Sequence, residues 1–163
     1  VFHVDMPEVN LPRAKIFDEL LGAPRSRCAV TTVDLDLLDK DKTLATELGQ
    51  GAGFDPAAPS LFVAEGLVMY LGAEGKIKLL EDVSAVAAPG SVLVLQFMEA
   101  AADAPEAHAA NALSAEEATR ELTKRGWEDF EFSRYGDEKL SFGRYPEGLA
   151  PSISFSFCVC RKA

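Results

Sequence analysis

Acidic residues stand directly after apolar, strand-like runs at three places in this chain. The runs are FHV before Asp5, AVTTV before Asp34 and LFVA before Glu65, and helix-like segments separate them. This alternation predicts a parallel α/β sheet, because parallel neighbours need a long crossover connection that is usually a helix. The carboxyl ends of parallel strands lie at one edge, so we expect the three acids where open sheets of this kind bind ligands.

The segments between these strands are predicted to be helices. One predicted helix has Pro12 in its first turn and Ile16 and Phe17 on its apolar face, and a polar helix follows over about residues 40–48. A third is apolar at spacings of three and four and ends before Pro89. GQGAGF looks like a glycine-rich cofactor loop, but it follows a helix and leads to a strand, so we interpret it as a surface loop.

The second half of the chain adds a fourth strand, SVLVLQFM, and a helix that begins at a capping box of Ser114 and Glu117. Residues 99–111 are rich in Ala and acids and form the best candidate for an insertion or lid. EDFEFSRY and SISFSFCVC alternate with a period of two, which predicts an antiparallel strand pair at the end of the sheet. We therefore expect one domain over residues 1–163 with a mostly parallel sheet.

Composition excludes several classes of partner. A net charge of -10 repels phosphate backbones, so nucleic acid is not expected, and no apolar run is long enough to span a bilayer. Three cysteines, Cys28, Cys158 and Cys160, make an odd count that suits a reducing, intracellular compartment, with the cytoplasm favoured and an organelle left open. We expect Cys158 and Cys160 to be buried apolar side chains, and no metal site, since His3 and His108 lack zinc-like spacing.

The three acids suit a nucleotide-containing ligand. An acid in the position of Asp5 can accept hydrogen bonds from both ribose hydroxyls. Asp34 can accept from an adenine amino group while Leu35 covers the ring, and Glu65 can pair with an ammonium. The alternative is structural, because acids at strand ends also cap the next helix or face water.

Four segments together resemble the leucine carboxyl methyltransferase family and its bacterial relatives: VFHVDMPEV, VTTVDLDLL, LFVAEGLVMYL and FCVCRKA. The resemblance implies a Rossmann-like O-methyltransferase that uses S-adenosyl-L-methionine, with a protein C-terminus or a small-molecule carboxylate as acceptor. It implies that Asp5 holds the ribose, Asp34 and Leu35 the adenine, and Glu65 the methionine part. The catalytic residue stays unknown, because a sulfonium and a carboxylate need positioning more than proton transfer. Tyr70 is expected in the core, with the substrate side as the alternative.

The sequence departs from the family at its front. Family members carry a first strand and a glycine-rich turn before the segment that resembles VFHVD, and we expect that strand between those ending in Asp5 and Glu65. Without it both neighbours expose backbone groups. The chain is then a piece of a longer protein, or another polypeptide supplies the strand, or the two neighbours pair. The alternative function is a catalytically inactive, methyltransferase-derived subunit of a larger assembly.

Overall fold

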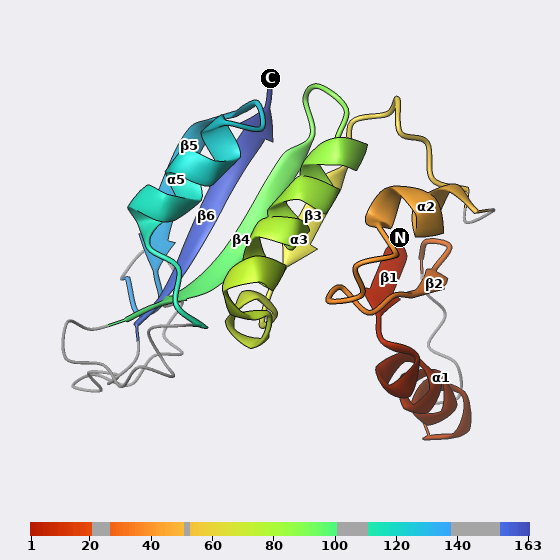
Figure 1. Cartoon of the computed structure of the whole chain (residues 1–163). Helices are drawn as coiled ribbons and strands as arrows, with labels where there is room; N and C mark the ends of the chain where they lie inside the picture. Colours follow the sequence, from red (N-terminus) through yellow and green to blue (C-terminus); the bar gives the residue numbers. More distant parts are fainter. Residues whose placement is uncertain (21–26, 51–52, 101–110, 138–153) are drawn as a thin grey trace. The chain divides into compact units, whose positions relative to one another are not determined.

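The structure is a computed structural model, and it describes residues 1–20, 27–50, 53–100, 111–137 and 154–163 (Figure 1). These residues form two compact units, the first from Val1 to Asp55 and the second from Pro56 to Ala163, and each is described by itself. Within these ranges, none of the helices has both the length and the apolar character that a bilayer span requires. Most of the predicted insertion at residues 99–111 lies outside the described residues.

The first unit is built on a β–α–β arrangement. Its elements are β1 (Phe2–Asp5), α1 (Pro7–Leu20), β2 (Thr31–Asp34) and α2 (Leu44–Gly49). β1 and β2 pair in parallel, and their register sets Phe2 opposite Thr31 and Asp5 opposite Asp34. The predicted parallel arrangement is therefore confirmed for these two strands, with α1 as the first part of the connection between them.

Helix α1 begins at Pro7, so the prediction that Pro12 lies in its first turn is wrong. Proline fits the first helical position because the N–H that it lacks would have no partner there. Pro12 lies inside the helix, where the missing N–H costs one backbone hydrogen bond. Two apolar side chains of this helix are exposed to a large extent, Ile16 by 50% and Phe17 by 41%.

Helix α2 begins later than predicted because Thr43 caps it. The Thr43 hydroxyl accepts a hydrogen bond from the backbone N–H of Thr46 (3.2 Å), and the Thr46 hydroxyl accepts one from the N–H of Thr43 (3.1 Å). This reciprocal pair satisfies donors that the first turn of a helix leaves free. The helix ends at Gly49, so the GQGAGF segment follows a helix, as predicted.

The second unit contains a four-stranded mixed sheet in the order β3–β4–β6–β5. β3 and β4 are parallel, whereas β6 is antiparallel to both of its neighbours. The predicted antiparallel pair is confirmed, and β6 lies inside the sheet between β4 and β5. The elements are β3 (Leu61–Ala64), η1 (Val68–Tyr70), α3 (Gly72–Val86), β4 (Val92–Glu99), α5 (Ala115–Thr123), β5 (Trp127–Arg134) and β6 (Ser154–Lys162).

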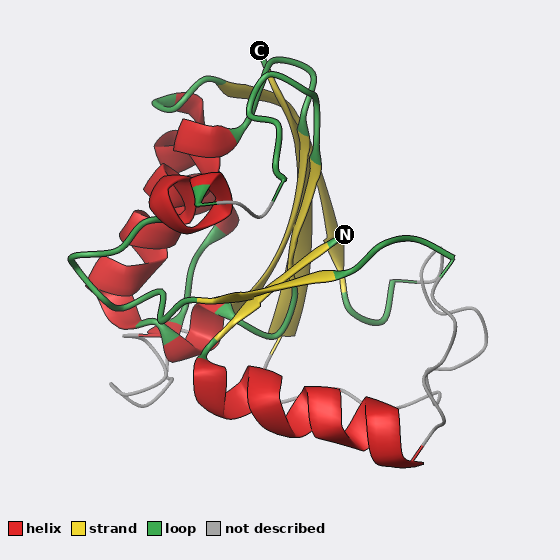
Figure 2. Ribbon diagram, turned by 90° about the vertical axis from the view of Figure 1, so that its right-hand side faces the viewer, coloured by secondary structure: helices red, strands yellow, loops and turns green. Residues whose placement is uncertain are grey.

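Helices α3 and α5 cover one face of this sheet (Figures 1 and 2). The covered face carries the apolar core, in which Phe97 of β4 and Cys158 of β6 are fully buried. Trp127 is 1% exposed, and its indole N–H donates to the hydroxyl of Ser84 in α3 (2.8 Å). Cys160 is also buried, so the predicted role of the two β6 cysteines as core side chains is confirmed.

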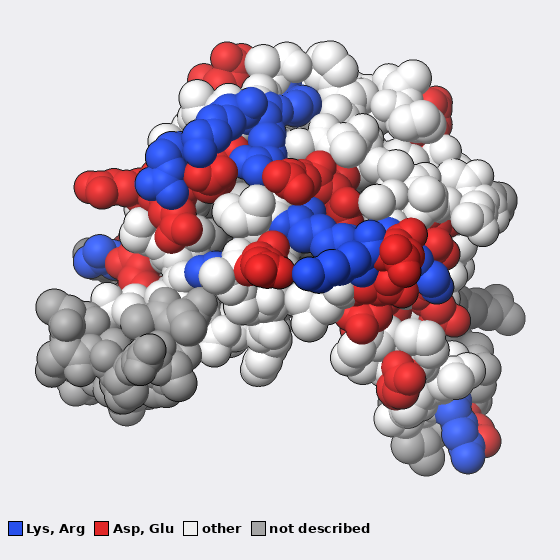
Figure 3. Space-filling view, in the orientation of Figure 1, with Lys and Arg blue, Asp and Glu red and all other residues white. Residues whose placement is uncertain are grey.

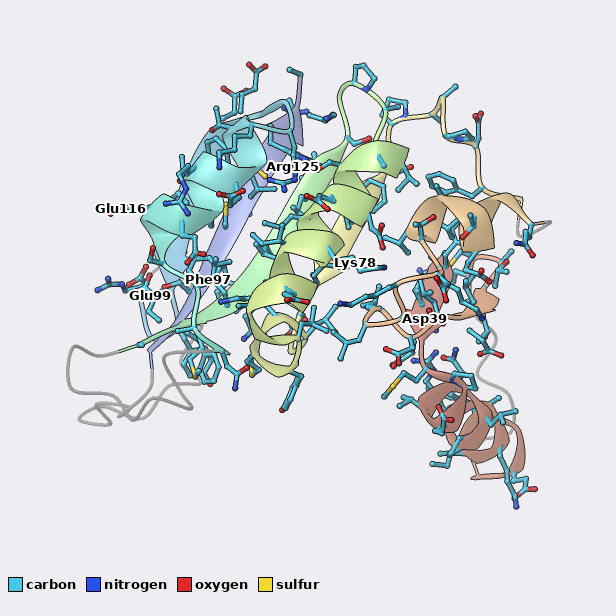
Figure 4. All side chains as sticks on the ribbon, viewed as in Figure 1. Asp39, Lys78, Phe97, Glu99, Glu116 and Arg125 are labelled. Carbon is cyan, nitrogen blue, oxygen red and sulfur yellow. The ribbon has the colours of Figure 1, made fainter. Side chains whose placement is uncertain are left out.

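A cluster of charged side chains ties α5 to α3. The Glu121 carboxylate accepts hydrogen bonds from Lys124 (2.8 Å), Arg125 (3.0 Å) and Arg120 (3.1 Å). Arg125, which Figure 4 labels, also donates to Glu81 of α3 (2.8 Å). Lys and Arg side chains accordingly alternate with Asp and Glu over α5 in Figure 3. These hydrogen bonds, led by that from Lys124, lower the pKa of Glu121 from 4.5 to about 2.

Candidate functional site

Two of the three predicted acids lie side by side at the carboxyl ends of β1 and β2. Asp5 and Asp34 are register partners on parallel strands, so their side chains point to the same side of the two-stranded sheet. The Asp5 side chain is 38% exposed, and Asp34 is also exposed. The first unit therefore presents two carboxylates at one strand edge, as the sequence predicts.

The two oxygens of Asp5 have different surroundings. Oδ1 accepts a hydrogen bond from the backbone N–H of Met6 (2.9 Å), which fixes the turn from β1 into α1. Oδ2 lies 3.8 Å from Nη1 of Arg13, too far for a hydrogen bond but close enough for an ion pair. Asp5 thus accepts a structural hydrogen bond at Oδ1, while Oδ2 is ion-paired with Arg13 at a distance longer than a hydrogen bond.

Asn10 of α1 connects the two strand ends. Its Nδ2 donates to Oδ1 of Asp34 (2.7 Å), and it also lies within hydrogen-bond distance of the backbone oxygens of Asp5 (3.0 Å) and Val33 (3.1 Å). Asn10 is 3% exposed, so these are the contacts of a buried amide. Arg13 donates to the Asn10 carbonyl from the other side. Within the described part of the chain, Asn10 is the one residue that donates a hydrogen bond to the Asp34 carboxylate.

Leu35, which the family resemblance assigns to the adenine, directly follows β2. Its side chain is only 1% exposed, and its backbone N–H donates to the carbonyl oxygen of Asp5 (2.9 Å). The residue therefore helps to hold the end of β2 against β1. Its contact with a ring stays a prediction, and a ring would reach it only if the side chains around it moved.

Glu65 directly follows β3 in the second unit and is exposed. Gly66 follows with φ at 64°, a conformation that side chains rarely adopt, and its N–H donates to Oε1 of Gln96 on β4 (2.7 Å). The turn that presents Glu65 is thus braced by the neighbouring strand. Tyr70 is 74% exposed, so the expectation that it lies in the core is wrong. The other interpretation, that Tyr70 lines the substrate side of the site, stays a prediction.

Sequence reasoning missed Asn10, Arg13 and Gln96. Asn is unfavourable inside a helix, because its side chain competes with the backbone, so its presence there signals a tertiary contact. The predicted helix started near Pro12, which placed Asn10 before it and hid this signal. Gln96 had no signal in the sequence, because its partner is a backbone group 30 residues away. No group of three or more potential metal ligands occurs among the residues that the structure describes.

Comparison with known families gives a match to the sequence model of leucine carboxyl methyltransferase over residues 1–84. A protein of Mycolicibacterium smegmatis, named as an S-adenosyl-L-methionine-dependent methyltransferase, is 35% identical over 90% of this chain and 45% of its own length. One of Mycobacterium tuberculosis with the same kind of name is 39% identical over 60% of this chain and 31% of its own. The chain thus spans less than half the length of these relatives.

Solved structures show the same fold. A methyltransferase from Thermobifida fusca superposes with a TM-score of 0.59 at 19% identity, over 100% of this chain and 63% of that one. A phosphoethanolamine N-methyltransferase from Haemonchus contortus, in complex with S-adenosylhomocysteine, gives a TM-score of 0.61 at 13% identity, over 99% of this chain and 43% of that one. The predicted Rossmann-like methyltransferase fold is confirmed.

Proposed function

Because the chain belongs to the leucine carboxyl methyltransferase family, we propose that it binds S-adenosyl-L-methionine and takes part in the transfer of its methyl group to a carboxylate. One observation carries the proposal: Asp5 and Asp34 lie side by side at the carboxyl ends of paired parallel strands. That edge is where open α/β sheets bind nucleotides. The M. smegmatis relative, named for dependence on the same compound, supports this choice of ligand.

The residues present fit the adenosine part of this ligand. Among the described residues, no side chain donates a hydrogen bond to Oδ2 of Asp34, since Asn10 bonds to Oδ1. Asp5 is partly exposed and faces Arg13 only at 3.8 Å through Oδ2. Both carboxylates can therefore accept hydrogen bonds from outside, Asp5 from ribose hydroxyls and Asp34 from the adenine amino group.

The chemistry asks little of the protein beyond binding and orientation. When bound, S-adenosyl-L-methionine supplies a methyl group on a positively charged sulfur, which is already activated. An acceptor carboxylate at neutral pH has already lost its proton, so no side chain has to act as a base. The task of Asp5 and Asp34 is to hold the adenosine part of the donor in one orientation, so that the acceptor can meet the methyl group in line.

Calorimetric titration with S-adenosylhomocysteine tests the binding step. We expect the full chain to bind this product, and Asp5→Ala to weaken binding by about 1–3 kcal/mol, because hydrogen bonds to a charged group are lost. Glu19→Ala is the matched control: it removes one exposed carboxylate from α1 of the same unit, away from the strand ends. No heat with the unmodified chain would contradict the proposal and would favour the inactive-subunit alternative.

The nature of the acceptor needs a separate assay. We propose methyl ester formation, and a synthetic peptide with a C-terminal leucine is the probe, because the family is named for that reaction. With methyl-labelled S-adenosyl-L-methionine, we expect label that mild base releases as methanol when the peptide has a free carboxyl end. The same peptide with an amidated end is the control. Equal, base-stable labelling of both peptides would overturn carboxylate methylation while leaving donor binding intact.

A further inference from the structure

The Asn10 side chain does more than fill space beside the two acids. Its amide has two N–H donors, and three oxygens lie within hydrogen-bond distance: Oδ1 of Asp34 (2.7 Å) and the backbone oxygens of Asp5 (3.0 Å) and Val33 (3.1 Å). The shortest of the three contacts goes to the carboxylate. Asn10 is thus saturated as a donor, and its carbonyl oxygen accepts from Arg13.

The contact with Asp34 fixes one oxygen of that carboxylate and turns the other outward. A carboxylate without such a contact rotates about its last bond and presents either oxygen. At 3% exposure Asn10 is held by its surroundings, so the Asp34 carboxylate gains a defined orientation. An oriented acceptor can favour a ligand with an amino group at one position over a ligand with a carbonyl there.

The contact between Asn10 and Arg13 keeps Arg13 from pairing more closely with Asp5. Nη2 of Arg13 donates to the Asn10 carbonyl, while Nη1 stays 3.8 Å from Oδ2 of Asp5. A guanidinium without that partner is free to close on Asp5 as a bidentate pair, which would occupy the oxygens meant for a ligand. Asn10 therefore acts on both acids, directly on Asp34 and through Arg13 on Asp5.

We propose that Asn10 is a positioning residue that holds Asp34 ready for the amino group of adenine and keeps Arg13 from closing on Asp5. The inference rests on the proposed function, because it assigns a role within the same adenosine site. It concerns specificity for the base rather than the chemical step, since Asn10 is buried behind the carboxylates. The substitution that isolates it is Asn10→Leu, which keeps the branched shape of the side chain and removes the amide.

The test compares two probes on the full chain: S-adenosylhomocysteine and S-inosylhomocysteine, in which a carbonyl replaces the adenine amino group. We expect the unmodified chain to prefer the adenosyl compound by about 10- to 100-fold, the range for hydrogen bonds to a charged group. In Asn10→Leu this ratio should fall to about 3-fold or less. Purely structural loosening would weaken both compounds together and leave the ratio unchanged, which would overturn the inference.

A second variant covers the case in which Asn10→Leu does not fold. Asp34→Asn leaves Asn10 in place, and the inference predicts that the new amide turns its oxygen to Asn10 and its N–H₂ to the ligand. Preference should then reverse toward the inosyl compound, and equal binding of the two would overturn the inference. If the unmodified chain binds neither probe, both the proposed function and the inference about Asn10 are overturned. If the unmodified chain binds and Asn10→Leu leaves the ratio of the two affinities unchanged, only the role of Asn10 is overturned.

Discussion

The two units of this protein differ in how well they bury their apolar side chains. In the described part of the first unit, the buried apolar side chains are Val33, Leu35, Leu44 and Leu48, while α1 leaves Leu11 69% exposed. The second unit buries far more. Among its described residues, α3, α5, β4, β5 and β6 all contribute fully buried side chains, which include Trp127, Phe97, Leu80, Leu93, Leu95, Leu122 and Cys158.

This difference separates stability from ligand recognition. The second unit has a core large enough to dominate the free energy of unfolding, because buried apolar area is the main stabilising contribution. The first unit carries Asp5, Asp34 and Asn10, the groups we assign to the adenosine. Regions that bind ligands are often less stable than the core, and a ligand that binds only the folded state stabilises them. We therefore expect the first unit to depend more on its ligand.

The largest expected effect is the difference in lost stability between two substitutions, one made in each unit. Phe97→Ala removes a fully buried ring of β4 that lies edge-on to Phe132 (6.4 Å between ring centres). It should lower the free energy of unfolding by about 3–5 kcal/mol. Phe17→Ala in α1 removes a ring that is 41% exposed, and should cost about 0.5 kcal/mol or less.

Urea titration measures both variants. Trp127 is the sole tryptophan of the chain and lies in the second unit, so its fluorescence reports on that unit, while far-UV circular dichroism follows helices and strands in both. Equal losses for Phe97→Ala and Phe17→Ala would break the comparison, because they would show that α1 is as well packed in solution as β4.

Hydrogen exchange should show the next largest difference. The β1–β2 ladder joins two strands of four residues, whereas β4 and β6 pair over eight positions inside a four-stranded sheet. We expect the free energy of opening for amides of β1 and β2 to be at least about 2 kcal/mol lower than for amides of β4 and β6. This difference corresponds to roughly 30-fold faster exchange in β1 and β2. S-adenosylhomocysteine should slow exchange in β1 and β2 and leave β4 and β6 unchanged. Protection in β4 and β6 alone would contradict the assigned site.

The smallest expected effect is a change in how the free energy of unfolding depends on pH, and it concerns the second unit. The pKa of Glu121 falls from 4.5 to about 2 on folding, because Lys124, Arg125 and Arg120 donate to its carboxylate. Its charge therefore stabilises the folded state above pH 4.5, and this contribution is lost as the pH falls from 4.5 towards about 2. Glu121→Gln should flatten the pH dependence of the unfolding free energy in that window.

Glu116→Gln is the control for this measurement. Glu116 lies on the exposed side of the same helix and is labelled in Figure 4. The Glu116→Gln substitution should leave the slope of the unfolding free energy against pH as in the unmodified chain. A slope that Glu121→Gln does not change would show that the charge cluster over α5 is not held in solution.

Local patterns predicted most of the regular structure. The strand Leu61–Ala64 was predicted with its observed bounds, and the helix capped by Ser114 begins at the following residue. In each case the signal lies in a few neighbouring residues: an apolar run that stops at an acid, or a capping side chain before a periodic segment. The start of α1 was missed because Pro7 and Pro12 both fit a first turn, and local sequence does not choose between them.

The sequence by itself determined that Asp5 and Asp34 end parallel strands, because alternating strands and helices leave few other arrangements, and it carried the family resemblance. Only the tertiary structure decided what each acid touches. The bridge from Asn10 to Asp34 joins residues 24 positions apart, and the brace from Gln96 to Gly66 joins residues 30 apart. Such contacts depend on the rotation of a helix and the register of two strands, which local sequence leaves open until the whole unit packs.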